Sequence, residues 1–278
     1  MPRTPSPEPR AQLRGVSIGF IGAGTMGQAL IKGLLARGLS RRALGAADAK
    51  RGTREAVRRR FGVWTTPDHA ALVRRSDVVI LAVKPQQFSE VVPGLAPIVG
   101  RRRLVISIAA GITLRWLEAR LPGVPLVRVM PNLPATVGCG FAGVAAGRGT
   151  TQRHRGIALA IFGSVGAAVE LPERQLNALT AVSGSGPAYV FFLVDAWERA
   201  AARLGLPPAV AARAIRSTLS GSARLLTLNE SPAGLIKRVA SKRGTTDAAL
   251  TVLARRRVAA HFIEALRAAA RRARQLSR

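Results

Sequence analysis

The chain has 278 residues, of which 43 are lysine or arginine and 14 are aspartate or glutamate, giving a formal net charge of +29. This length is enough for one large domain or two ordinary domains with well-packed cores. Hydrophobic residues make up 48% of the sequence and charged residues 21%, which excludes global intrinsic disorder. The single cysteine, Cys139, excludes an intramolecular disulfide framework and a cysteine-rich metal site.

The positive charge is spread over both halves of the chain. Its densest runs are short and far apart: Arg58–Arg60, Arg101–Arg103 and Arg255–Arg257. A nucleic-acid-binding protein is expected to show clustered basic residues with interleaved aromatics, or a recognisable module, and aromatic residues are only 4% here. We therefore interpret the charge as solvated surface and predict no specific nucleic-acid partner.

No segment is predicted to enter a membrane. Residues 1–14 lack the apolar core of a signal peptide, so we predict a disordered N-terminal tail and a cytoplasmic protein. The longest uncharged run, between Arg174 and Asp195, is interrupted by Ser183–Pro187 and is predicted not to span a bilayer. His154 and His261 are isolated and show no ligand spacing, so no metal site is predicted.

Short apolar runs alternate with helical stretches through the first part of the chain. The run Asp77–Val83 is almost continuously apolar, as expected for a strand that is covered on both faces of its sheet. Strands that alternate with helices predict an α/β fold with a parallel, doubly wound sheet. The predicted strands are Val16–Ile21, Ala43–Ala47, Asp77–Val83, Leu104–Ile108 and Val124–Val129, and the short apolar run Val63-Trp64 lies between the second and the third.

After about residue 170 the sequence is rich in alanine, leucine and arginine and has no strand-like runs. Glycine- or proline-containing breaks divide it, which predicts an all-helical second domain over residues 171–278. The predicted helices are Gln175–Ala181, Ala188–Leu204, Pro208–Leu228 and Thr246–Arg274.

A glycine-rich segment directly follows the first predicted strand and opens a helix, and it fits the pattern G-x-G-x-x-G. In this context the first glycine makes a tight turn, the second lets the backbone approach a pyrophosphate, and the third allows close helix–strand packing. The helix N-terminus supplies a positive dipole end. We therefore predict a Rossmann-type dinucleotide-binding domain over residues 15–170. The predicted cofactor-binding residues of this loop are Gly22, Ala23, Gly24, Thr25, Met26 and Gly27.

The end of the second predicted strand bears on the choice of cofactor. Asp48 suits a ribose 2′-hydroxyl and favours NAD, whereas Lys50 and Arg51, which follow it, suit a 2′-phosphate. The two basic residues favour NADPH, and NADH stays open.

Four further segments, in this order, resemble the pyrroline-5-carboxylate reductase family. Together with the glycine loop they cover the chain from residue 15 to about residue 250, and the third is the most specific. The segments are Ala82-Val83-Lys84-Pro85, Arg128–Asn132, Ser183–Tyr189, and Ser231-Pro232 followed by Gly244-Thr245-Thr246.

The resemblance implies a fold and an activity. The N-terminal domain holds the dinucleotide, and the helical domain interlocks with a partner subunit to give a homodimer or a higher homo-oligomer. Each active site lies between the two domains. The implied reaction is hydride transfer from NAD(P)H to the cyclic imine 1-pyrroline-5-carboxylate, which yields L-proline in the last step of proline biosynthesis.

The resemblance also implies roles for individual residues. Thr246 is the implied catalytic residue, with its hydroxyl against the imine nitrogen. Two glycine-rich turns that open helices offer backbone N–H groups to the substrate carboxylate. The substrate-binding residues implied are Ser183, Gly184, Ser185, Gly186, Gly244, Thr245 and Thr246. The further cofactor-binding residues implied are His69, Ala82, Val83, Lys84, Pro85, Ala109 and Ala110.

The sequence departs from the family pattern at the substrate turn. The family usually has Ser-Pro-Gly-Gly-Thr-Thr, and this chain has Lys242-Arg243 in place of Pro-Gly. If the replaced glycine requires a positive φ, we expect Arg243 to be strained. Alternatives are therefore a reductase of a related cyclic imine or hydroxy acid, or a catalytically impaired homologue with a nucleic-acid-binding or regulatory role. The absence of lysine between Lys84 and Lys237 argues against a β-hydroxyacid dehydrogenase.

Overall fold

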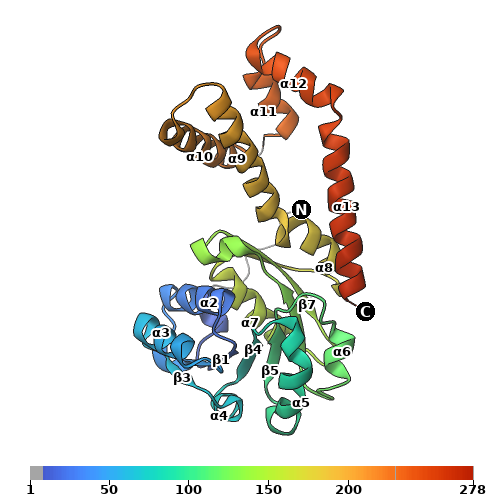
Figure 1. Cartoon of the computed structure of the whole chain (residues 1–278). Coiled ribbons are helices and arrows are strands. Elements are labelled where there is room, and N and C mark those ends of the chain that lie inside the picture. The colour runs from blue at the N-terminus through green and yellow to red at the C-terminus, as the bar shows by residue number, and fades with distance from the viewer. Residues whose placement is uncertain (1–8, 229, 278) are drawn as a thin grey trace. The chain divides into compact units, whose positions relative to one another are not determined.

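The computed structural model describes residues 9–228 and 230–277, and the chain divides into two compact units. The first contains the chain up to Ser185 together with the segment from Ala269 onward, and the second contains Gly186–Ala268. The first unit is built on a sheet (Figure 1), and the described residues of the second are helical. The predicted α/β class with a helical C-terminal region is confirmed, whereas the functional limits 15–170 and 171–278 stay predictions.

The sheet has eight strands within the described residues, in the order β3-β2-β1-β4-β5-β6-β7-β8. All neighbouring strands are parallel except β6 and β7, which are antiparallel. The order reverses between β1 and β4, which is where dinucleotides bind in doubly wound sheets. The strands are β1 (Ile18–Ile21), β2 (Leu44–Ala47), β3 (Trp64–Thr66), β4 (Val78–Leu81), β5 (Leu104–Ser107), β6 (Leu126–Met130), β7 (Gly140–Ala146) and β8 (Gly166–Glu170).

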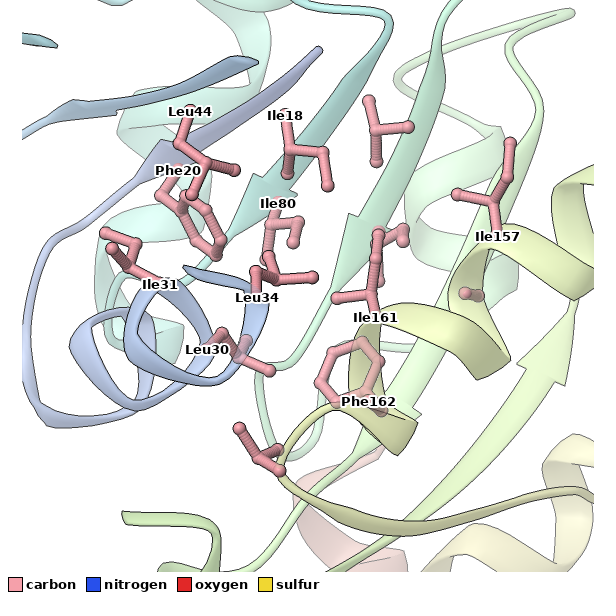
Figure 2. Packing of buried hydrophobic residues seen from close by; sticks show 14 of the residues in the cluster. Ile18, Phe20, Leu30, Ile31, Leu34, Leu44, Ile80, Ile157, Ile161 and Phe162 are labelled. Carbon is pink, nitrogen blue, oxygen red and sulfur yellow. The ribbon is translucent and has the colours of Figure 1, made fainter. Parts of the chain in front are cut away.

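Helices cover both faces of this sheet, and the central strands β1, β4 and β5 are buried at every position. On one face, β1 and β4 pack against α2 and α7, and Figure 2 shows Phe20, Ile80 and Leu34 in this cluster. On the other face, α4, α5, α6 and α8 pack around residues such as Phe88 and Leu72. The helices of this unit are α1 (Pro9–Gln12), α2 (Thr25–Ala36), α3 (Arg51–Phe61), α4 (His69–Arg74), α5 (Phe88–Val99), α6 (Leu114–Glu118), α7 (Gln152–Gly163) and α8 (Glu173–Leu179).

Two parts of the first unit differ from the sequence-based prediction. Strands β7 and β8 were not predicted, because their segments consist largely of glycine and alanine and each contains a single β-branched residue, Val144 or Val169. The disordered tail was predicted to reach residue 14, but α1 is helical and Leu13 is buried in the same cluster as Ile157. The rest of the predicted tail, residues 1–8, lies outside the described residues.

The second unit consists of helices with a small core. Its buried cluster contains Ala201 on α9 with Ala211 and Ile215 on α10. The helices are α9 (Gly186–Arg203), α10 (Pro208–Leu225), α11 (Pro232–Val239), α12 (Thr245–Arg255) and α13 (Val258–Leu276), the last of which continues into the first unit.

The long helix predicted over Thr246–Arg274 is in fact two helices, and α11 was not predicted. The break falls at Arg256-Arg257, where Arg257 has a φ of 53°. A residue in this left-handed region ends an α-helix, and an arginine gives no sequence signal for it because glycine is the usual residue there.

The predicted break at Ser183–Pro187 is absent. A π-helical turn, Thr180–Gly184, joins α8 to α9, so the helix continues from Glu173 to Arg203. Among the described residues this is the one helix long and apolar enough to cross a membrane, by length and composition only. That property does not by itself identify a membrane protein, and the absence of a membrane partner stays a prediction.

Candidate active site

The glycine loop lies between β1 and α2, at the point where the strand order reverses. Gly22 has a φ of +95°, and a Cβ atom there would lie 2.7 Å from the Ala82 carbonyl oxygen. A Cβ atom on Gly27 would lie 2.7 Å from the Gly22 oxygen, whereas one on Gly24 would meet nothing within 4 Å. The first and third glycines are therefore required by the packing of the chain, and the second faces open space.

The beginning of α2 has no side-chain cap, because its N-cap residue is Gly24. The first backbone N–H groups of a helix have no partner within that helix. Together with the open space at Gly24, they form a cradle that a Cβ atom would fill and that suits a pyrophosphate. The described residues of the loop thus fit a dinucleotide.

Asp48 fastens this loop to the end of β2. Its Oδ2 accepts a hydrogen bond from the Ala23 N–H at 3.0 Å, and its Oδ1 accepts one from the Lys50 N–H at 2.9 Å. The sequence predicted only a ribose ligand here and missed this structural role. Arg51 is paired with Glu55 at 2.7 Å, and its hydrogen bond and charge lower the pKa of the Glu55 carboxyl.

The other predicted cofactor residues follow the carboxyl ends of neighbouring strands. Ala82 follows β4 and donates its N–H to the Ile21 oxygen at 2.7 Å, beside Gly22. Lys84 is exposed, and its N–H donates to the Gln87 side chain at 3.2 Å. Residues 109–110 follow β5, the neighbour of β4. The structure therefore brings the loops after β1, β4 and β5 to one edge of the sheet.

His69 lies apart from these loops in the strand order. It is half-buried at the start of α4, directly after the N-cap Asp68, and follows β3 at the outer edge of the sheet. It therefore lies at the same carboxyl edge of the sheet as Gly22. The two are separated by β2, which Asp48 follows.

The electrostatic perturbation around Asp77 lies at the opposite edge, where β1 and β4 begin. Burial raises the pKa of the Asp77 carboxyl, but hydrogen bonds from Ser17 and the charges of Arg103 and Arg153 outweigh it, so the pKa lies below its ordinary value. The Ser17 hydroxyl donates to Asp77 Oδ2 at 2.6 Å. This pair fastens the starts of two adjacent strands and takes no part in the cofactor edge.

Asn132, at the end of the Arg128–Asn132 motif, links β6 to the π-helical turn. Its side-chain amide donates to the Ser183 hydroxyl at 3.0 Å, and its Oδ1 accepts the Phe141 N–H at 2.8 Å. A Cβ atom on Gly184 would lie 2.7 Å from the Met130 methyl group, so the turn packs tightly against the end of β6.

The local structure of Ser183–Gly186 differs from the predicted turn. The segment does not open a helix after a break, because it continues one, and the Ser185 N–H is bonded to the Thr180 oxygen at 2.8 Å. The Ser185 N–H is therefore used within the helix. The role of Ser183, Gly184, Ser185 and Gly186 toward the substrate stays a prediction.

The second predicted turn does open a helix. Helix α12 begins at Thr245, its N-cap is Gly244, and no side chain caps it. Thr246 is half-buried and Thr245 is exposed. Arg243 has a φ of 60°, which confirms the expectation that an arginine here occupies a conformation favoured by glycine.

An acidic residue that the sequence reasoning missed contacts this turn. The Arg243 N–H donates to Asp247 Oδ2 at 3.1 Å. The signal that was available is the position of Asp247 as the third residue of the helix, where an acidic side chain reaches back to the N–H groups before it.

Comparisons with known proteins cover both units. Residues 173–276 match the family described as pyrroline-5-carboxylate reductase dimerisation, and residues 17–111 match the one described as NADP oxidoreductase, coenzyme F420-dependent. A pyrroline-5-carboxylate reductase from Methanosarcina acetivorans is 38% identical over 94% of this chain and 98% of its own length. The chain belongs to the pyrroline-5-carboxylate reductase family. The family resemblance inferred from the sequence is thereby confirmed, and with it an NAD(P)H-dependent oxidoreductase.

Further relatives agree with this membership. A pyrroline-5-carboxylate reductase from Pseudomonas aeruginosa is 39% identical over 94% of the chain and 96% of its own length. The structure of the family member from Coxiella burnetii has a TM-score of 0.89 at 35% identity, covering 95% of this chain and 99% of that one. The one from Plasmodium falciparum, with NADP bound, has a TM-score of 0.85 at 25% identity, covering 95% and 99%. The dimerisation match supports self-association of the chain.

Proposed function

We propose that this chain reduces 1-pyrroline-5-carboxylate to L-proline with NAD(P)H, as the last step of proline biosynthesis. The observation that carries this proposal is the match to a reductase of that name over 94% of this chain and 98% of the relative. Because nearly all of both chains is matched, the cofactor loop and the substrate turn come from one enzyme type. No described feature favours a hydroxy-acid reductase or a nucleic-acid-binding homologue.

The cofactor-binding role falls to the edge formed by the loops after β1, β4 and β5. Gly24 leaves room for a pyrophosphate and α2 offers uncapped N–H groups to it. Bound there, NAD(P)H supplies the hydride that is transferred. Ala82–Pro85 and Ala109–Ala110 line the same edge, with His69 toward the adenosine side. Since Asp48 is engaged with two backbone N–H groups, Lys50 next to it favours NADPH over NADH.

The substrate role falls to the start of α12. The uncapped N–H groups of Thr245 and Thr246 suit a carboxylate, because a helix N-terminus attracts anions. The imine carbon accepts a hydride and the ring nitrogen gains a proton, so the product amine is one hydride and one proton richer. We assign the Thr246 hydroxyl to the imine nitrogen as the catalytic group that orients the ring, since positioning is the main demand of a hydride transfer.

The helical domain, residues 171–278, is proposed to form a homodimer or a higher homo-oligomer. Its match to the dimerisation family and its many exposed apolar side chains support this. Residues 15–170 are the proposed dinucleotide-binding domain. A cytoplasmic location without membrane or specific nucleic-acid partners stays a prediction.

The direct test mixes the purified full chain with 1-pyrroline-5-carboxylate and either NADPH or NADH, and follows the loss of nicotinamide absorbance. We expect turnover, faster at low cofactor concentration with NADPH. No turnover with either cofactor would overturn the proposal.

The role of Thr246 is tested by removing its hydroxyl. We expect Thr246→Ala to lower kcat about a hundredfold, the scale of a positioned polar catalytic group, and Thr246→Ser to restore most of it. Thr251→Ala is the matched control, because Thr251 lies on the same helix and its hydroxyl donates to the Asp247 carbonyl oxygen at 2.9 Å. An unchanged kcat in Thr246→Ala would refute this role and leave the family membership standing.

A further inference from the structure

The turn before α12 contains a conformation that its residue does not favour. Among the described non-glycine residues, Arg243 and Arg257 are the ones with positive φ, at 60° and 53°. A side chain with a Cβ atom is disfavoured in this left-handed region, which glycine enters freely. This conformation costs Arg243 conformational energy, which a local interaction can offset.

Asp247 supplies that interaction. Its Oδ2 accepts the Arg243 N–H at 3.1 Å across four residues, and a hydrogen bond to an ionised acceptor is stronger than one between neutral groups. The following residue is held as well, because the Gly244 N–H donates to the Ser241 oxygen at 3.0 Å. A Cβ atom on Gly244 would lie 2.3 Å from the Ser241 hydroxyl oxygen, so the Ser241 side chain packs closely against the backbone of Gly244.

The Asp247 carboxylate differs from the capping side chains of other helices in the position of the N–H group that it accepts. Asp68, Thr151 and Ser231 each accept an N–H from within the helix that follows them. Asp247 instead accepts an N–H from before its helix, and the N-cap Gly244 has no side chain to bond the first N–H groups of α12. The N–H groups of Thr245 and Thr246 are thus left for another acceptor.

We propose that Asp247 is the positioning residue of the substrate turn, holding Arg243 in its left-handed conformation so that the Thr245 and Thr246 N–H groups face the substrate carboxylate. This rests on the proposed function. Asp247 contacts neither substrate nor cofactor in this account and acts through the backbone of Arg243.

The negative charge of Asp247 disfavours binding of an anionic substrate, although its hydrogen bond favours the turn that binds it. A carboxylate in the first turn of α12 partly cancels the positive end of the helix dipole, while the exposed Lys242 and Arg243 add two positive charges nearby. The hydrogen-bonding and electrostatic effects of Asp247 therefore have opposite signs. Asp247→Asn separates them, because an amide oxygen still accepts the Arg243 N–H but carries no charge.

The test compares KM and kcat in the full chain. We expect Asp247→Ala to raise KM for 1-pyrroline-5-carboxylate about tenfold, equivalent to about 1.4 kcal/mol, with kcat and the KM for NADPH within about twofold. Asp247→Asn should restore most of the substrate affinity. Arg243→Gly in the Asp247→Ala background should restore it too, because glycine adopts the turn without help. Thr151→Ala, which removes the cap of α7 in the first unit, should leave both KM values unchanged.

The outcomes separate this inference from the proposed function. If the unsubstituted chain reduces 1-pyrroline-5-carboxylate and Asp247→Ala keeps its substrate KM, the positioning role is overturned and the function stands. A raised KM that Arg243→Gly fails to restore also overturns it, because the effect then does not pass through Arg243. If the unsubstituted chain has no such activity, the function and the substrate role fail together. The Arg243–Asp247 coupling itself remains measurable then, since Asp247→Ala should lower thermal stability less in the Arg243→Gly background.

Discussion

The two units of this chain bury their apolar side chains to very different degrees. In the first, helices cover both faces of the sheet, and Phe20, Phe88 and Phe162 are fully buried. In the second, the buried cluster is small, and large apolar side chains such as Phe191 and Phe192 are exposed, the latter by 68%. The first unit has a core of its own, whereas the second exposes large apolar side chains on several helices, as interaction surfaces do. The dimerisation match falls on residues 173–276, which include that surface.

The largest effect should come from placing a charge on this surface. We expect Phe192→Glu to reduce the oligomer to monomers, because an unpaired charge in an apolar interface costs about 3 kcal/mol or more. Light scattering after size-exclusion chromatography measures the mass. Val169→Glu, at an exposed position on β8 of the first unit, is the matched control and should leave the mass unchanged. If the Phe192→Glu protein keeps the mass of the oligomer, the exposed apolar side chains of the second unit do not form the subunit interface.

The next effect concerns a buried ion pair inside the first unit. Arg128 is 3% exposed and bonds to Glu173 at 3.0 Å, and the same carboxylate accepts the Leu114 N–H at 2.8 Å. Glu173→Ala leaves a buried charge unpaired, so we expect a loss of about 3 kcal/mol in the free energy of unfolding. Denaturant unfolding should show this loss at every protein concentration, because the unit has its own core.

The control for the ion pair is Glu170→Ala. Its partner Arg155 lies 3.2 Å away and both side chains are more than a third exposed, so the expected loss is less than about 1 kcal/mol. Equal losses in the two variants would show that the burial of Arg128 does not determine the effect.

A smaller effect separates packing from ligand binding within the glycine loop. Gly24→Ala adds a methyl group that meets nothing in the chain, so stability should be unchanged while KM for NADPH rises about tenfold, equivalent to about 1.4 kcal/mol. Gly22→Ala should destabilise the first unit instead, because of its φ of +95° and the contact with Ala82. Gly52→Ala on α3, also in open space, should not raise KM. An unchanged KM for NADPH in Gly24→Ala would contradict pyrophosphate binding at Gly24.

The smallest effect lies at the corner between α12 and α13. Arg257→Gly replaces a strained residue with one that accepts a φ of 53°, and we expect a gain of about 0.5 kcal/mol after the entropy cost of glycine. Thermal unfolding at fixed concentration measures it. A loss of stability would show that the arginine side chain contributes more than its backbone costs.

The sequence was informative where periodicity and glycine chemistry act locally. The central strands follow from their continuous apolar runs, and the glycine loop follows from its place between a strand and a helix. The strain at Arg243 was also foreseen, because the replaced residue is a glycine in the family pattern.

The remaining features depend on contacts between distant residues or on weak local signals. Strands β7 and β8 are too rich in glycine and alanine to be recognised, and the π-helical turn packs against Met130, which is distant in sequence. The Asp48–Ala23 bond joins residues 25 positions apart. No local pattern encodes the fact that Asp48 fastens the glycine loop.

This chain makes proline from its cyclic imine at the expense of a reduced nicotinamide. The most direct measurement quantifies proline by mass spectrometry together with the NADPH oxidised by the purified full chain. We expect proline and oxidised cofactor to form in equal amounts, and neither to form without 1-pyrroline-5-carboxylate. Oxidation of NADPH without proline, or no reaction with NADPH or NADH, would contradict the account.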